Sequence, residues 1–168
     1  MNDTYIVTGY VVLEDLVRVL QYHDDGRAEL SAAEILTVAV VAAKYFQNHH
    51  ERALYLLVQL GYLRAFSVSR FNRRLHALSE WLWHVAGIIG DVLAKGKVFI
   101  VDTLPIPICK RVRAKRCRKV QGSVFAGYCA AKQEHYFGWQ LHLVCDAAGV
   151  PVAFELLPAA YDELVTIQ

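Results

Sequence analysis

Asp102 is the residue whose position in the sequence most suggests chemistry. It directly follows the apolar run Val98–Val101, and β-branched and aromatic residues in such a run are typical of a strand buried on both faces. A carboxylate at the end of a buried strand is costly unless another group pairs with it, so we predict that Asp102 binds a metal ion at the end of a central strand. Pro105 and Pro107 lack the N–H that strand pairing uses and are expected to end that strand.

A dense run of positive charge follows this predicted strand. Between residues 110 and 119 there are seven cations and no acid. Such runs commonly bind the phosphates of nucleic acids, and a solvated loop is the alternative. The candidate nucleic-acid-binding residues, called the basic segment below, are Lys110, Arg111, Arg113, Lys115, Arg116, Arg118 and Lys119.

The cysteines indicate no metal site. Cys109, Cys117, Cys129 and Cys145 form no Cys-x-x-Cys pair, and the spacing of Cys109 and Cys117 does not support zinc binding. We expect reduced thiols, as in an intracellular protein.

Composition predicts a folded, water-soluble chain. With 168 residues, 55% of them hydrophobic, the sequence allows one medium domain or two small ones and is too apolar for a disordered protein. The richest apolar stretches, Ile35–Ala43 and Trp81–Ala94, fall short of the roughly 18 uninterrupted apolar residues that span a bilayer. The N-terminus also lacks the basic region of a signal peptide. We therefore expect a cytoplasmic protein that does not contact membranes.

Helical periodicity dominates residues 1–95. Ser31 and Glu34 form a capping box before an almost wholly apolar helix, and Gly61 ends a later helix. The basic helix that follows, capped by Ser67 or Ser69, is compatible with a helix-turn-helix, with an ordinary solvated basic face as the alternative. The predicted helices cover residues 11–20, 31–46, 51–60, 70–78 and 81–94.

Strand patterns replace helical periodicity after residue 95, where we place a domain boundary. Residues 136–145 and 150–156 alternate between apolar and polar positions around the turn Asp146–Gly149, which predicts a β-hairpin. Residues 162–168 look like the start of another helix. Because so small a sheet and an unburied helix are unusual, we expect that the polypeptide ends before its fold does.

The order of these motifs resembles the DDE-type transposases of bacterial insertion sequences. The resemblance covers residues 96–168 well and the helical part loosely. It is carried by Val98–Thr103, the basic segment, Gly138–Val144, Asp146–Val152 and Leu156–Asp162.

The resemblance implies a fold and an activity. Residues 96–168 would be the first part of an RNase H-like domain, and Asp102 would be the first of three catalytic acids that hold two Mg²⁺ (or Mn²⁺) ions for DNA cleavage and strand transfer. The family's later Asp and Glu have no counterpart here. Glu163 stands where many relatives have Asp, Asp162 where they have His, and Gln140 where they often have Lys or Arg.

The resemblance therefore implies a truncated transposase. Such a chain would not hold the metal ions stably and would not cut or join DNA alone. Its implied partners are the DNA ends of the insertion sequence, the target DNA, and a second copy or a full-length transposase.

Two other functions are open. The chain could be a non-enzymatic nucleic-acid-binding protein or regulator of transposition that uses the basic segment. It could also be a structural or oligomerisation module in which backbone N–H groups satisfy Asp102. The predicted fold class is α+β, with an all-helical domain over residues 1–95 and, as the resemblance implies, an incomplete RNase H-like domain over residues 96–168.

Overall fold

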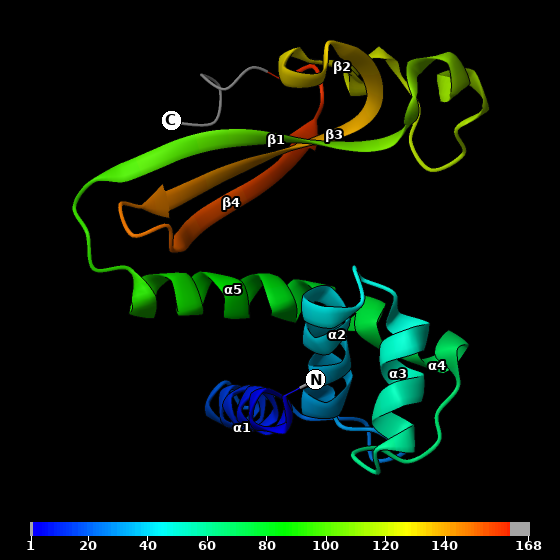
Figure 1. The fold of residues 1–168 in the computed structure, drawn as a ribbon, viewed down its shortest axis with the longest axis vertical. Coiled ribbons are helices and arrows are strands. Elements are labelled where there is room, and N and C mark those ends of the chain that lie inside the picture. The colour runs from blue at the N-terminus through cyan, green and yellow to red at the C-terminus, as the bar shows by residue number, and fades with distance from the viewer. Residues whose placement is uncertain (1, 162–168) are drawn as a thin grey trace. The chain divides into compact units, whose positions relative to one another are not determined.

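A computed structural model describes residues 2–161 and shows an α+β protein with two compact units, Met1–Val85 and Ala86–Gln168. The predicted α+β class is confirmed. The helices are α1 (Asp3–Val19), α2 (Ala32–Tyr45), α3 (His50–Gln59), α4 (Val68–Ala77) and α5 (Ser79–Leu93). The strands are β1 (Phe99–Lys110), β2 (Ala126–Cys129), β3 (Glu134–Asp146) and β4 (Pro151–Pro158), and short 3₁₀ helices cover Arg111–Arg116 (η1), Ser123–Phe125 (η2) and Ala130–Lys132 (η3) (Figure 1). Within the described residues, no helix is both long and apolar enough to cross a bilayer.

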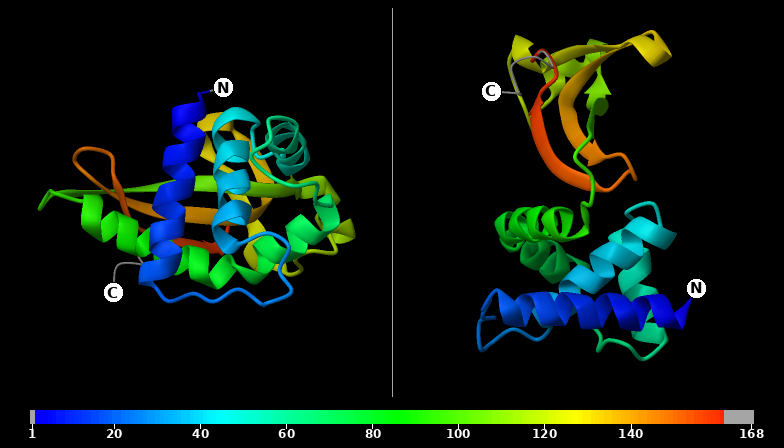
Figure 2. Two further views of the ribbon diagram at one scale, coloured as in Figure 1. Left: turned by 90° about the horizontal axis from the view of Figure 1, so that it is seen from below. Right: turned by 90° about the vertical axis from the view of Figure 1, so that its left-hand side faces the viewer.

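The helical unit is organised around α2, which packs against α1, α3 and α4 (Figure 2). The predicted capping box is present, since the Ser31 N–H donates to Glu34 at 2.7 Å and the Glu34 N–H donates to Ser31 Oγ at 3.2 Å. Most of α2 is buried, as expected for a helix that is apolar nearly all round. The largest buried apolar side chains of the unit's core are Ile6, Leu13, Leu30, Ile35, Leu36, Val38, Val41, Leu54, Leu57, Phe71 and Leu78.

Helix α1 begins earlier than the sequence analysis predicted. Apolar periodicity indicated a start near residue 11, but the helix begins at Asp3, because the Asn2 side chain caps it by accepting from the Thr4 N–H at 3.0 Å. Ile6 in this first part is buried, which adds packing to the cap. The cap of α4 is Ser67, which accepts from the Arg70 N–H at 3.3 Å.

The division between the two units falls inside α5, after Val85, whereas the sequence analysis placed a boundary near residue 95. The reason lies in the second half of α5. A side chain at Gly90 would place its Cβ 2.7 Å from the Pro151 carbonyl oxygen of β4. This part of the helix therefore touches the sheet closely and belongs to the second unit.

The sheet of the second unit is antiparallel, and β3 is its central strand. β1 pairs with one edge of β3, while β2 and β4 pair with successive parts of the other edge. The expectation that Val98–Val101 forms a central strand buried on both faces is therefore wrong for the described residues. β1 pairs with a single strand, and Ile100 and Val101 are 57% and 45% exposed.

The prolines do not end β1. Pro105 pairs with Gln140 and Pro107 with Gly138, and the register shifts only after Pro107. Because these prolines are two residues apart, their ring nitrogens face the same edge of the strand. On an edge strand that edge can be the unpaired one, where a missing N–H costs no ladder hydrogen bond.

The predicted β-hairpin of β3 and β4 is confirmed. Its turn is built on Asp146, whose carboxylate accepts from the N–H groups of Ala148 and Val150 at 2.9 Å each and of Lys95 at 3.3 Å. Gly149 adopts a φ of 82°, which favours glycine. The Asp146 side chain is buried, and it joins the turn to the segment between α5 and β1.

These contacts make stability depend on pH in a defined direction. Backbone N–H donation by Val150, and then by Lys95 and Ala148, lowers the pKa of Asp146 although burial opposes this. A lowered carboxyl pKa contributes stability above the unfolded-state value of about 3.9 and loses it as the pH falls through the folded-state value.

We expect Asp146→Asn to lower the free energy of unfolding at pH 7 and to differ less from the wild type at pH 3. Urea unfolding followed by circular dichroism at both pH values measures this difference. Asp91→Asn, which alters an exposed acid of the same unit, is the matched control. An Asp146→Asn deficit of equal size at both pH values would contradict the assignment.

Candidate functional site

Asp102 lies within β1, exposed to solvent. Its Oδ1 accepts from the N–H of the adjacent Thr103 at 2.8 Å. It pairs in register with Leu143, so both side chains lie on one face of the sheet, and Ile100 and Leu104 lie on the same face two residues away. Asp102 is therefore an accessible carboxylate surrounded by apolar positions, not a buried charge at a strand end.

The described residues do not assemble a metal site around Asp102. No group of three or more His, Cys, Asp or Glu side chains that could hold a metal ion occurs among residues 2–161. Glu155 on β4 cannot join Asp102 in a metal site. Asp102, Leu143 and Phe154 are paired across the three strands, so their side chains lie on the same face of the sheet. Glu155 is the neighbour of Phe154 in β4, so its side chain lies on the opposite face. Asp162 and Glu163 lie outside the described residues.

The basic segment is a continuation of β1. Lys110 is the last residue of the strand, and η1 then carries Arg111, Arg113, Lys115 and Arg116. The Arg111 guanidinium lies 3.2 Å from His135 Nδ1 on β3. All seven cations are exposed, and none forms an ion pair with a described residue. Their charge is thus available to an external anion.

The structure does not bring Asp102 and the basic segment together. They are eight residues apart along an extended strand, which places them up to about 26 Å apart at roughly 3.3 Å per residue. At 3.4 Å per base pair, that separation corresponds to about eight base pairs of duplex DNA. The two features could contact one DNA molecule only at separate positions.

The arginines of α4 are largely engaged within the helical unit. Arg70 forms an ion pair with Glu29, and Arg74 forms one with Asp24. The connection between α3 and α4 runs from Leu60 to Ser67, longer than the three- or four-residue turn of a helix-turn-helix. A DNA-reading role for this helix stays a prediction.

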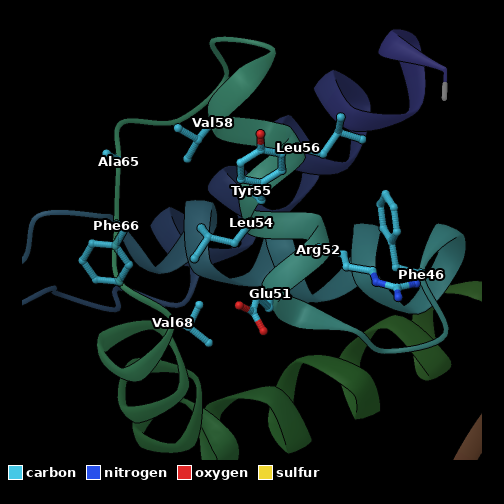
Figure 3. Close-up of a pocket in the computed structure, with 10 residues that line it drawn as sticks. All are labelled: Phe46, Glu51, Arg52, Leu54, Tyr55, Leu56, Val58, Ala65, Phe66 and Val68. Atoms are coloured by element: carbon cyan, nitrogen blue, oxygen red, sulfur yellow. The ribbon is translucent and has the colours of Figure 1, made fainter.

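A hollow of about 790 Å³ lies in the helical unit along α3. Its lining is mostly apolar and includes Phe46, Leu54, Tyr55 and Phe66, with Glu51 and Arg52 at one side (Figure 3). It contains none of the residues that the sequence analysis singled out.

A smaller hollow of about 410 Å³ does involve the basic segment. It is lined by Cys109, Arg113, Arg116 and Cys117. The sequence analysis expected these two cysteines to be reduced thiols, with zinc binding as an alternative that their spacing does not support. The signal available in the sequence was that Cys109 and Cys117 flank most of the basic segment.

The chain matches no protein-family model, no curated protein and no solved structure in comparisons with known proteins.

The placement of Asp102 predicts that removing its carboxylate changes the free energy of unfolding very little. An exposed side chain that accepts from its neighbouring N–H contributes little to stability, so Asp102→Asn should change the free energy of unfolding by less than about 0.5 kcal/mol. Urea unfolding beside the Asp146→Asn variant measures the contrast. A loss for Asp102→Asn as large as that for Asp146→Asn would favour the structural-module alternative.

Proposed function

We propose that this chain acts on DNA as a protein of the DDE transposase type, with Asp102 as a metal ligand and the basic segment as a contact for DNA backbone phosphates. The observation that carries the proposal is the arrangement along β1. One strand presents an exposed acid with a minor structural role and leads directly into seven exposed cations that form no ion pair with residues 2–161.

The order of elements supports an RNase H-like interpretation of the second unit. A long first strand that carries the acid pairs antiparallel with the first strand of a hairpin, in the sequence that the resemblance implies. In that family the first strand is central. Here the second edge of β1 is open within the described residues, and a strand pairing there would make β1 central. An experimental structure in the presence of DNA would test this interpretation.

The residues described do not fit a two-metal centre. Two divalent ions in a nuclease-type site need several carboxylates on rigid elements, and residues 2–161 place Asp102 alone. The chain's own contribution that we propose is therefore one metal ligand together with non-specific DNA binding. Phosphate contacts of this kind position DNA without reading its sequence.

A second function is favoured by the same observations. Exposed cations without a described metal site suit a non-enzymatic DNA-binding protein, for example one that competes with a complete transposase for DNA ends or pairs with it. The two functions differ in whether Asp102 binds a metal ion when the chain is bound to DNA.

The first test concerns the salt dependence of DNA binding. We expect affinity for duplex DNA to fall steeply with salt, and the triple variant Lys115→Ala, Arg118→Ala, Lys119→Ala to reduce the slope of log affinity against log salt by up to about 3, because each phosphate contact contributes roughly 0.9. Fluorescence anisotropy with a labelled duplex measures this slope.

The matched control removes three exposed cations from the helical unit through Lys44→Ala, Arg52→Ala and Arg64→Ala. This control should leave the slope nearly unchanged. Equal losses in the two triple variants would mean that binding follows overall charge and not the basic segment.

The second test concerns catalysis. The described residues supply only the Asp102 carboxylate to the proposed metal site. The purified chain should therefore bind DNA in Mg²⁺ or Mn²⁺ without cleaving or joining it. Asp102→Asn should bind DNA equally well. Gel assays of cleavage and strand transfer provide the measurement. Metal-dependent strand transfer that Asp102→Ala abolishes would show that this chain completes an active site.

A further inference from the structure

Two thiols flank η1. Cys109 lies in β1 just after the register shift at Pro107, and Cys117 caps the C-terminus of η1 through its N–H, which donates to the Ala114 carbonyl at 3.0 Å. Both cysteines are free and partly exposed. Both line one hollow, and their side-chain interaction raises the pKa of Cys109 and lowers that of Cys117.

The surroundings of the two sulfurs differ. Backbone N–H groups of Val120 and Lys119 donate to Cys117 and lower its pKa, and Cys109 and the Lys119 charge act in the same direction. Partial burial raises the pKa of Cys109. The hollow that both cysteines line also includes Arg113 and Arg116, so peroxide-sized molecules can approach through a positively charged opening.

This asymmetry is the arrangement that reactive thiol pairs use. A thiolate is the nucleophile in thiol oxidation, and it forms at accessible positions near cations and N–H donors. A second thiol within reach then resolves the oxidised sulfur. Cys117 has the environment of the reactive thiolate, and Cys109 is placed as the resolving thiol.

We propose that Cys109 and Cys117 form a peroxide-sensitive thiol pair in which Cys117 is oxidised first and Cys109 closes a disulfide across η1. The Cys117 thiolate attacks hydrogen peroxide, the O–O bond breaks, and the departing hydroxide takes up a proton to leave as water. The resulting sulfenic acid is then attacked by the Cys109 sulfur; the S–O bond breaks, the S–S bond forms, and the thiol proton leaves with the hydroxyl group as a second water. Peroxide is the oxidant, and the two thiols supply the two electrons.

The other two cysteines provide an internal comparison. Cys129 lies in β2 opposite Glu134, and Cys145 lies in β3 between Ile100 of β1 and Pro151 of β4. Their sulfurs are also free and partly exposed. A general sensitivity to oxidant would therefore modify them as well.

The experiment treats the whole purified chain with a small excess of hydrogen peroxide and maps disulfides by mass spectrometry after blocking the remaining thiols. We expect a loss of about 2 Da and a Cys109–Cys117 cross-linked peptide. Cys109→Ser should instead accumulate a sulfenic acid on Cys117, which dimedone traps. Cys117→Ser should abolish the cross-link, whereas Cys129→Ser and Cys145→Ser should leave it intact.

Unfolding supplies the control for geometry. In concentrated urea the preference for the Cys109–Cys117 pair should weaken to what their short separation in sequence alone provides, because the folded geometry and the N–H donors are lost. The disulfide map of the wild-type chain does not depend on any variant. It therefore stands even if a serine variant misfolds. Cross-links distributed among all four cysteines in the folded chain, or dimedone labelling of Cys145 before Cys117, would overturn the proposal.

Discussion

The second unit depends on the buried carboxylate of Asp146. This side chain binds the N–H groups of its own turn and that of Lys95, and Asp146 pairs in register with Phe99, the first residue of β1. One group thus fixes the end of α5, the start of β1 and the turn between β3 and β4 relative to one another. Because a buried carboxylate without these donors would be costly, the three segments are constrained to meet at this point.

That constraint explains the register in which β1 pairs with β3. Once Phe99 is held opposite Asp146, the antiparallel register runs along β3 as far as Lys110. β4 and β2 occupy the other edge of β3, so β1 is an edge strand among residues 2–161, and Asp102 within it is exposed. The fold therefore uses Asp146 for structure and leaves Asp102 with only a minor structural role, and the proposed function rests on this difference.

Local signals in the sequence predicted local structure well. The Ser31–Glu34 capping box and the hairpin around Gly149 follow from side-chain types at fixed spacings, and both are present. The position of β1 in the sheet could not be predicted in this way. An apolar run such as Val98–Val101 looks the same in a central strand and in an edge strand, because burial depends on distant partners. The role of Asp146 was missed for the same reason, since one of its donors is Lys95.

The edge position of β1 among the described residues also bears on how readily another chain could pair with this strand. An open strand with exposed apolar residues is a template on which another chain can grow a continuous ladder. Pro105 and Pro107 leave two gaps in the row of donors that such a ladder would need, and the irregularity after Pro107 bends the strand away from ideal register. The same prolines that β3 tolerates thus limit any intermolecular sheet to the short stretch before Pro105.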